Sequence, residues 1–167
     1  MGFDISHARV LKFGDHVDTD VIIPARYLNT SDKKELVAHC MEDIDPSYMK
    51  RIQPGDVIVA GRNFGYGSSR EHAPMVIKES GVALIIATSF ARIFYRNALN
   101  IGLPIIECPQ AAKDADEGDE ISADLATGTL VNHTQGTQYE TGAYPPFIQK
   151  IIEAGGLSKL AQLGGFG

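Results

Sequence analysis

Three short apolar runs alternate with two helical patterns in the middle of the chain, and this alternation restricts the fold more than any other feature. The apolar runs are residues 57–60, 82–87 and 103–107. Between them, a helical pattern over residues 73–80 stops at Gly81, and apolar residues recur at helical spacing from Phe90 to Ile101. Helices that cross between consecutive strands normally join parallel strands in a sheet that helices cover. The sequence therefore predicts an α/β fold with parallel strands at its centre.

The flanking segments extend this arrangement. Strands are predicted at residues 8–13 and 21–23, the second stopped by Pro24, and helix caps at Asp32 and Ser89. After Pro109 the pattern changes to a hairpin over residues 120–125 and 129–133, and residues 146–163 are helical with a break at Gly155 and Gly156. The chain has 167 residues, 44% of them apolar, and no linker-like tract. We therefore expect one mixed-sheet α/β domain over residues 1–167.

Charge and cysteine content argue against several classes of protein. The net charge is −6, and the basic residues form no cluster beyond Lys33 and Lys34, which argues against a nucleic-acid partner. No run approaches the roughly 20 apolar residues of a membrane span, and the N-terminus lacks the pattern of a signal peptide, which predicts a cytoplasmic protein without a membrane partner. Cys40 and Cys108 lack metal-site spacing, so no metal or iron–sulfur site is predicted on this chain.

The segment from Asn63 to Pro74 follows the first of the three apolar runs and concentrates reactive side chains. Its glycines allow close approach to a ligand, its serines offer a nucleophile or base, and Arg70 offers a clamp for a carboxylate. Ser68 and Glu71 also fit a helix-capping box, but Pro74 would then fall inside the helix, so Ser68 is predicted to lie in the loop. In open α/β sheets, ligands bind beyond the carboxyl ends of strands, which is where this segment lies.

Simpler interpretations remain open for several residues. A nucleotide site would need a glycine at Arg70, so the loop fits the phosphate-binding pattern poorly, although a small-anion or nucleotide-binding module without catalysis stays an alternative. His16 and His72 fit ordinary packing or capping as well as base catalysis. Asp18 and Asp20 fit a solvated turn as well as a metal site. The two arginines at positions 92 and 96 fit ordinary surface charge.

Two motifs identify a family resemblance. The first is residues 61–74, Gly-Arg-Asn-Phe-Gly-Tyr-Gly-Ser-Ser-Arg-Glu-His-Ala-Pro, and the second is residues 89–97, Ser-Phe-Ala-Arg-Ile-Phe-Tyr-Arg-Asn. Both resemble the swivel domain of aconitase-type hydro-lyases. Residues 18–28 and 153–157 extend the likeness over nearly the whole chain, which more narrowly resembles the separate small subunits of the 3-isopropylmalate dehydratase family. The resemblance implies a single swivelling β/β/α domain of the aconitase C-terminal type. It also implies a hydro-lyase step of leucine biosynthesis.

Roles for particular residues follow from the resemblance. A cluster-bearing large subunit is the implied partner, with the [4Fe–4S] cluster on that subunit and a small dicarboxylate as substrate. Ser68 is implied to be the catalytic base, with Ser69 and Arg70 holding the substrate. Supporting positions are Asp18, Asn63, Gly65 and Gly67.

Residues 27–30 are implied to select the substrate. The segment reads Tyr27, Leu28, Asn29 and Thr30. Homoaconitase-like relatives tend to carry an arginine where Asn29 stands, which would neutralise a further carboxylate. Without that arginine, and with Leu28 offering apolar contact, isopropylmalate is favoured over homocitrate or citrate. The alternatives are the small subunit of homoaconitase and that of 2,3-dimethylmalate dehydratase.

Overall fold

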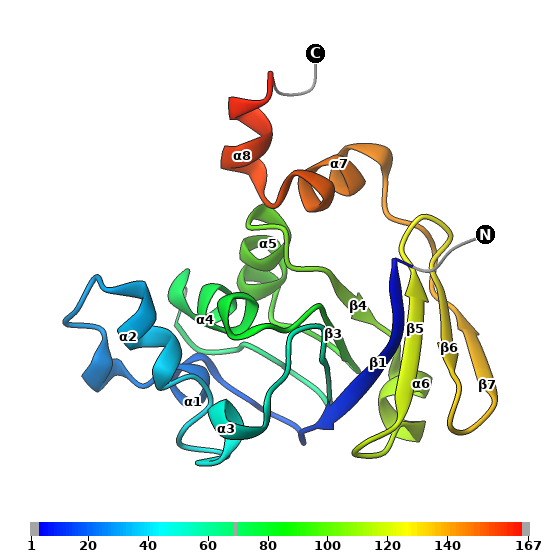
Figure 1. Ribbon diagram of the computed structural model, residues 1–167, viewed down its shortest axis with the longest axis horizontal. Coiled ribbons are helices and arrows are strands. Elements are labelled where there is room, and N and C mark those ends of the chain that lie inside the picture. Colours follow the sequence, from blue (N-terminus) through cyan, green and yellow to red (C-terminus); the bar gives the residue numbers. More distant parts are fainter. Residues whose placement is uncertain (1–3, 69, 165–167) are drawn as a thin grey trace.

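A seven-stranded mixed sheet forms the centre of the computed structural model, which describes residues 4–68 and 70–164 (Figure 1). The strand order is β4-β3-β2-β1-β5-β6-β7. The strands are β1 (Ile5–Lys12), β2 (Val57–Ala60), β3 (Leu84–Ala87), β4 (Ile105–Glu107), β5 (Glu120–Asp124), β6 (Thr129–Asn132) and β7 (Thr137–Glu140).

The four strands β1 to β4 are parallel, which confirms the prediction from the alternating pattern. Helix α4 (His72–Ser80) crosses from β2 to β3, and helix α5 (Arg92–Asn100) crosses from β3 to β4. Gly81 ends α4 in the left-handed conformation, with a φ of 118° that glycine adopts without strain. The loops after β2, β3 and β4 consequently leave the same edge of the sheet.

The antiparallel half of the sheet is built from the last three strands. β5 pairs with β1, β6 pairs with β5, and β7 pairs with β6, all antiparallel. The hairpin predicted over residues 120–133 is confirmed. β7 and helix α6 (Pro109–Asp114) were not predicted.

Both faces of the parallel strands are buried. On one face, Leu11, Ile58 and Ile85 pack with side chains of α4 and α5. On the other face, Val10, Val59 and other strand residues pack with α6 and with β5 and β6. Because each strand is covered on both sides, its sequence is a continuous apolar run rather than an alternating one.

The strand predicted at residues 21–23 is wrong. Residues Thr19–Ile22 form the short helix α1, and the side chain of Asp18 accepts a hydrogen bond of 2.7 Å from the N–H of Val21. That cap stabilises a helical turn where apolarity alone suits either conformation. The cap predicted at Ser89 is also wrong, because its hydroxyl accepts from the N–H of Asn63 at 2.9 Å and α5 begins after Ala91.

The remaining helices lie around this core. They are the 3-10 turn η1 (Ala25–Tyr27), α2 (Lys33–Ala38), α3 (Tyr48–Arg51), α7 (Pro146–Ala154) and α8 (Leu157–Gln162). Asp32 caps α2 through the N–H of Lys34 at 3.0 Å, as predicted. None of the helices within residues 4–68 and 70–164 has the length and apolar character that a bilayer span requires.

Burial of Cys40 makes stability sensitive to alkaline pH. Burial raises the pKa of the thiol to about 12, from 9.0, although Ser80 and Tyr48 partly offset the shift. The unfolded thiol ionises above about pH 9 while the folded thiol stays protonated. The contribution of this group to the stability of the fold is therefore complete below pH 9 and is lost as the pH rises towards 12. Between those limits, the free energy of unfolding should fall by about 1.4 kcal/mol per pH unit through this group alone.

Chemical denaturation of the wild type and of Cys40→Ala checks this expectation. The variant loses packing at every pH, so it should be less stable at pH 7. The stability difference should shrink by about 1 kcal/mol or more between pH 8.5 and pH 10.5. A difference that stays constant over this range would show that the buried thiol does not govern the alkaline loss.

Candidate active site

The loop of residues 61–70 leaves the carboxyl end of β2 and is anchored on two sides. On one side, the N–H of Phe64 donates to the carbonyl of Ser89, and the N–H of Ala91 donates to the carbonyl of Phe64, both at 3.0 Å. On the other side, the N–H of Gly65 donates to the carbonyl of Val17 at 2.7 Å. The loop therefore lies between the start of α5 and the segment before α1.

Two positions in this loop require glycine. Gly65 has a φ of +83°, and a Cβ atom there would lie 2.2 Å from Cγ of Phe94. Gly67 has a φ of +109°, and a Cβ atom there would lie 3.1 Å from the hydroxyl of Thr19. The glycines thus let the loop approach α5 and α1 closely.

Ser68 is exposed at the tip of the loop. Its N–H donates to the hydroxyl of Thr19 at 3.1 Å, and its own hydroxyl oxygen accepts from the N–H of Arg70 at 3.3 Å. α4 begins at His72 without a side-chain cap, so Ser68 lies in the loop near the positive end of that helix, as predicted. Ser69 lies outside the described residues.

Arg70 connects the loop to α1. Its terminal nitrogen Nη1 lies 3.2 Å from the carbonyl oxygen of Ile23 and 3.5 Å from Oδ1 of Asp20. The side chain is 22% exposed. A guanidinium has five N–H donors, and the other terminal nitrogen makes no contact with a carboxylate in the described part of the chain. Arg70 can therefore offer donors to a ligand while α1 holds it in place.

The segment 18–20 caps α1 and contacts the loop. Asp18 was predicted to support the site, and its carboxylate caps α1. Thr19, which is buried, holds the backbone of Ser68, and Asp20 contacts Arg70 and accepts from the N–H of Ala25 at 2.9 Å. Thr19 and Asp20 received no role in the site from the sequence, although they stand in the same short polar segment.

Asn63 and the two histidines lie at the rim of the loop. The side-chain nitrogen of Asn63 is 3.4 Å from Nδ1 of His16, and the ring of His16 meets the ring of Tyr66 edge-on at 5.8 Å. Within the described residues, no hydrogen bond of Asn63 or His16 reaches Ser68, and His72 is exposed at the first position of α4. This geometry favours the packing interpretation of His16.

Residues 27–30 are held by their own set of contacts. The Tyr27 hydroxyl donates to Glu42 at 2.5 Å, and its ring stacks on the ring of His39 at 3.7 Å. The Tyr27 and His39 hydrogen bonds lower the pKa of Glu42, which keeps its carboxylate charged. Leu28 packs partly against the core, and Asn29 is exposed. Within the described residues, no hydrogen bond or ion pair joins residues 27–30 to the loop 63–70.

The two cysteines do not fit an iron–sulfur cluster. Cys40 belongs to the core on one face of the sheet, and Cys108 belongs to the core on the other face. Burial keeps the thiol of Cys40 protonated, whereas a cluster ligand is a thiolate. These residues cannot bind one cluster together.

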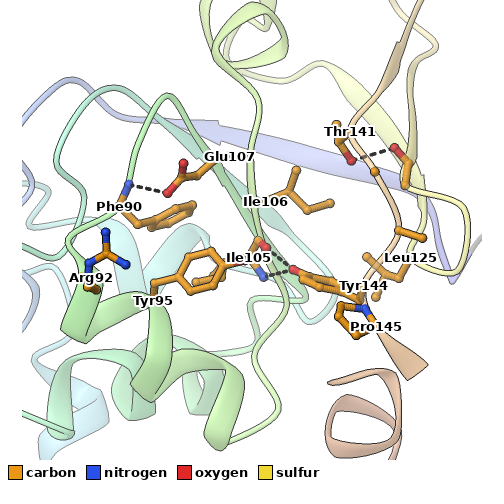
Figure 2. A pocket seen from close by; sticks show the side chains of 13 residues that line it. Phe90, Arg92, Tyr95, Ile105, Ile106, Glu107, Leu125, Thr141, Tyr144 and Pro145 are labelled. Atoms are coloured by element: carbon orange, nitrogen blue, oxygen red, sulfur yellow. Dashed lines mark hydrogen bonds between the residues drawn. The ribbon is translucent and has the colours of Figure 1, made fainter. Parts of the chain in front are cut away.

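A half-open pocket of about 540 Å³ lies beside the loop, beyond the carboxyl ends of β3 and β4 (Figure 2). Its walls include Phe90, Arg92, Tyr95, Glu107 and Tyr144. The Tyr144 hydroxyl donates to the carbonyl of Ile105, which fixes one wall of the pocket. None of the residues predicted for the active site lines it.

Comparisons with known proteins define the class and then the family. The aconitase C-terminal domain model matches residues 45–111, which include the loop and α4 and α5. The chain is 61% identical to the 3-isopropylmalate dehydratase small subunit of Clostridium beijerinckii, over 89% of this chain and 92% of the relative. It is 59% identical to the 2,3-dimethylmalate dehydratase small subunit of Eubacterium barkeri, over 89% of this chain and 91% of the relative.

A solved structure agrees with these relatives. The crystal structure of 3-isopropylmalate dehydratase from Methanocaldococcus jannaschii superimposes with a TM-score of 0.87 at 44% identity, over 94% of this chain and 93% of that chain. This chain belongs to the 3-isopropylmalate dehydratase small-subunit family, within the aconitase-related dehydratases. The family and fold class predicted from the sequence are confirmed.

Proposed function

We propose that this chain and a large subunit together interconvert 2-isopropylmalate and 3-isopropylmalate by dehydration and rehydration, a step of leucine biosynthesis. The observation that carries the proposal is the exposed Ser68, which accepts a backbone hydrogen bond from Arg70 at the positive end of α4. Relatives about 60% identical to this chain are named as small subunits of the corresponding dehydratase. The partner is a large subunit of the same enzyme.

Ser68 is the proposed base for the carbon next to the one that loses its hydroxyl group. As an alkoxide it takes the proton from that carbon. As a hydroxyl it gives a proton to the carbon that lost its hydroxyl group, when water adds to the other carbon of the unsaturated intermediate. A free serine is a weak base at neutral pH, so its alkoxide needs preorganised donors. The N–H of Arg70, 3.3 Å from the hydroxyl oxygen, and the positive end of α4 supply part of that stabilisation.

Arg70 is the proposed clamp for one carboxylate of the substrate. Its contacts with Ile23 and Asp20 fix one terminal nitrogen and leave the planar group free to pair with a carboxylate. Ser69 is proposed to assist, and the glycines bring the backbone close to the substrate. We propose that the large subunit carries a [4Fe–4S] cluster, which supplies the Lewis acid that makes the substrate hydroxyl a feasible leaving group.

Residues 27–30 are proposed to cover the part of the substrate that distinguishes one malate from another. Among the nearby cations, Arg26 lies 2.6 Å from Asp43 and Lys33 lies 3.9 Å from Glu79, whereas Lys34 has no ion pair in the described part of the chain. The one guanidinium of the three is therefore engaged. A third substrate carboxylate would therefore find no free guanidinium here. Leu28 suits an isopropyl group, which favours isopropylmalate over homoaconitate.

The second candidate substrate is 2,3-dimethylmalate, and the observation that favours it is the relative of that name with 59% identity. Both substrates present apolar carbon to Leu28, and they differ in the size of the apolar group. A hydrophobic pocket discriminates such differences by about 10-fold to 200-fold in kcat/KM.

Turnover of the reconstituted enzyme with 3-isopropylmalate, 2,3-dimethylmalate and homoaconitate tests the substrate. We expect kcat/KM to be at least about 10-fold higher for 3-isopropylmalate than for either of the others. Leu28→Ala should reduce that preference, whereas Asn29→Arg should improve turnover of homoaconitate. Equal or better turnover of 2,3-dimethylmalate by the wild type would assign the chain to that substrate instead.

A further inference from the structure

The exposed side chains on the outer face of α5 include Arg92, Ile93 and Arg96. We refer to these three residues as the α5 ridge. Positions 92, 93 and 96 lie on one side of a helix, opposite the buried residues Phe94 and Ala98. Ile93 is 53% exposed and adds apolar surface beside the two cations.

The two arginines of the ridge differ from the other arginines of the chain. Each of the others lies 2.6 to 3.5 Å from a carboxylate, in the pairs Arg9–Asp56, Arg26–Asp43, Arg51–Asp45, Arg62–Asp15 and Arg70–Asp20. Within residues 4–68 and 70–164, neither Arg92 nor Arg96 has an ion-pair partner, and Figure 2 draws Arg92 without a hydrogen bond to the pocket residues. Like charges four residues apart repel each other, so the ridge gains from an external anion.

The ridge lies next to the loop of residues 61–70, which we call the catalytic loop. The N–H of Ala91, the residue before the ridge, donates to the carbonyl of Phe64 in the loop at 3.0 Å. Phe94, on the inner side of the same helix, fills the space against Gly65. Tyr66, which is 40% exposed, adds a second large side chain to the loop's surface. A subunit that covers the exposed Ser68 thus meets this neighbouring surface as well.

The pocket of Figure 2 lies beside the ridge and offers a second place where a partner protein can bind. Arg92 lies at its wall together with the aromatic rings of Phe90, Tyr95 and Tyr144. Aromatic-lined pockets and arginines dominate the binding energy of protein interfaces. A volume of about 540 Å³ can accept a side chain of a partner protein.

We propose that the α5 ridge is a docking surface for the large subunit, which presents carboxylates to Arg92 and Arg96 and covers Ile93. This inference rests on the proposed function, because the partner is the subunit that completes the active site. Opposite charges across such an interface set the register and the rate of association. The ridge positions the catalytic loop over the partner and takes no part in the chemistry.

The test is a titration of a fixed amount of this chain with the large subunit of the same enzyme, followed by turnover of 3-isopropylmalate. The variants are Arg92→Gln/Arg96→Gln and, separately, Ile93→Asp. We expect the half-saturating concentration of large subunit to rise by about 30-fold in the double variant, the size of one strong interface contact. Raising the salt from 50 to 300 mM should weaken wild-type association and have a smaller effect on the double variant.

A matched control is Lys50→Gln, which removes an exposed cation from α3, at a distance from α5 in Figure 1. It should titrate like the wild type. If the double variant and Ile93→Asp both titrate like the wild type, with the same salt dependence, the ridge is not the docking surface. If the wild type itself neither binds the large subunit nor turns over substrate, the proposed function fails instead, so the two failures are distinguishable.

Discussion

Replacing Ser68 with alanine is expected to lower kcat of the reconstituted enzyme by about 10³-fold, within the range for loss of a positioned base. The hydroxyl is exposed at the loop tip and accepts from the N–H of Arg70, so it is the side chain placed to exchange a proton with the substrate. Its backbone N–H, which holds the loop through Thr19, is retained in the variant. The loop should therefore keep its structure, and KM should change much less than kcat.

Steady-state kinetics with 3-isopropylmalate measures this effect, with cluster content and subunit affinity matched between samples. Ser6→Ala is a suitable control, because Ser6 is an exposed serine in β1, outside the loop. It should leave kcat unchanged. If Ser68→Ala retains most of the wild-type kcat, another group is the base, and Ser68 is only a loop residue.

Replacing Gly65 with alanine is expected to have the largest effect on stability. The new Cβ atom would lie 2.2 Å from Cγ of Phe94 and 2.6 Å from its Cβ, and the backbone has a φ of +83°. Overpacking and backbone strain each cost about 1–3 kcal/mol, so the free energy of unfolding should fall by about 3 kcal/mol. Any folded variant should also lose activity, because Phe94 and the loop must move apart.

Urea denaturation of the isolated chain measures the change. Gly14→Ala is the matched control, since a Cβ atom at Gly14 meets nothing within 4 Å. That substitution should change the free energy of unfolding by less than about 1 kcal/mol. A Gly65→Ala variant as stable and as active as the wild type would show that the loop does not need this close approach to α5.

The predictable part of the fold is the part with strong local patterns. Buried parallel strands leave continuous apolar runs, and α4 and α5 leave helical periodicity that ends at Gly81 and near Gly102. By contrast, β7 is an edge strand whose residues are partly or fully exposed, so it carries little apolar signal. The run at residues 21–23 was misassigned because three apolar residues fit a helix or a strand equally well, and the cap from Asp18 decides.

Only the part of the candidate site that lies in one stretch of sequence could be predicted. The loop of residues 63–70 concentrates its chemistry in one stretch, and the glycine requirement at Gly65 is visible there. The contact of Thr19 with Ser68 spans 49 residues, and that of Arg70 with Asp20 spans 50. Such contacts depend on how α1 packs against the loop, which no spacing in the sequence reveals. Similarly, the hydrogen bond from the Tyr27 hydroxyl to Glu42 spans 15 residues, and substrate binding by Tyr27 stays a prediction.

The most direct test of the account is whether this chain completes a site that it cannot form alone. Turnover of 3-isopropylmalate should be measured anaerobically for the chain alone, for the cluster-bearing large subunit alone, and for the two mixed. We expect negligible turnover by either subunit alone, and turnover by the mixture that saturates with added chain. Full activity of the large subunit alone, or no activity of a mixture with an intact cluster, would contradict it.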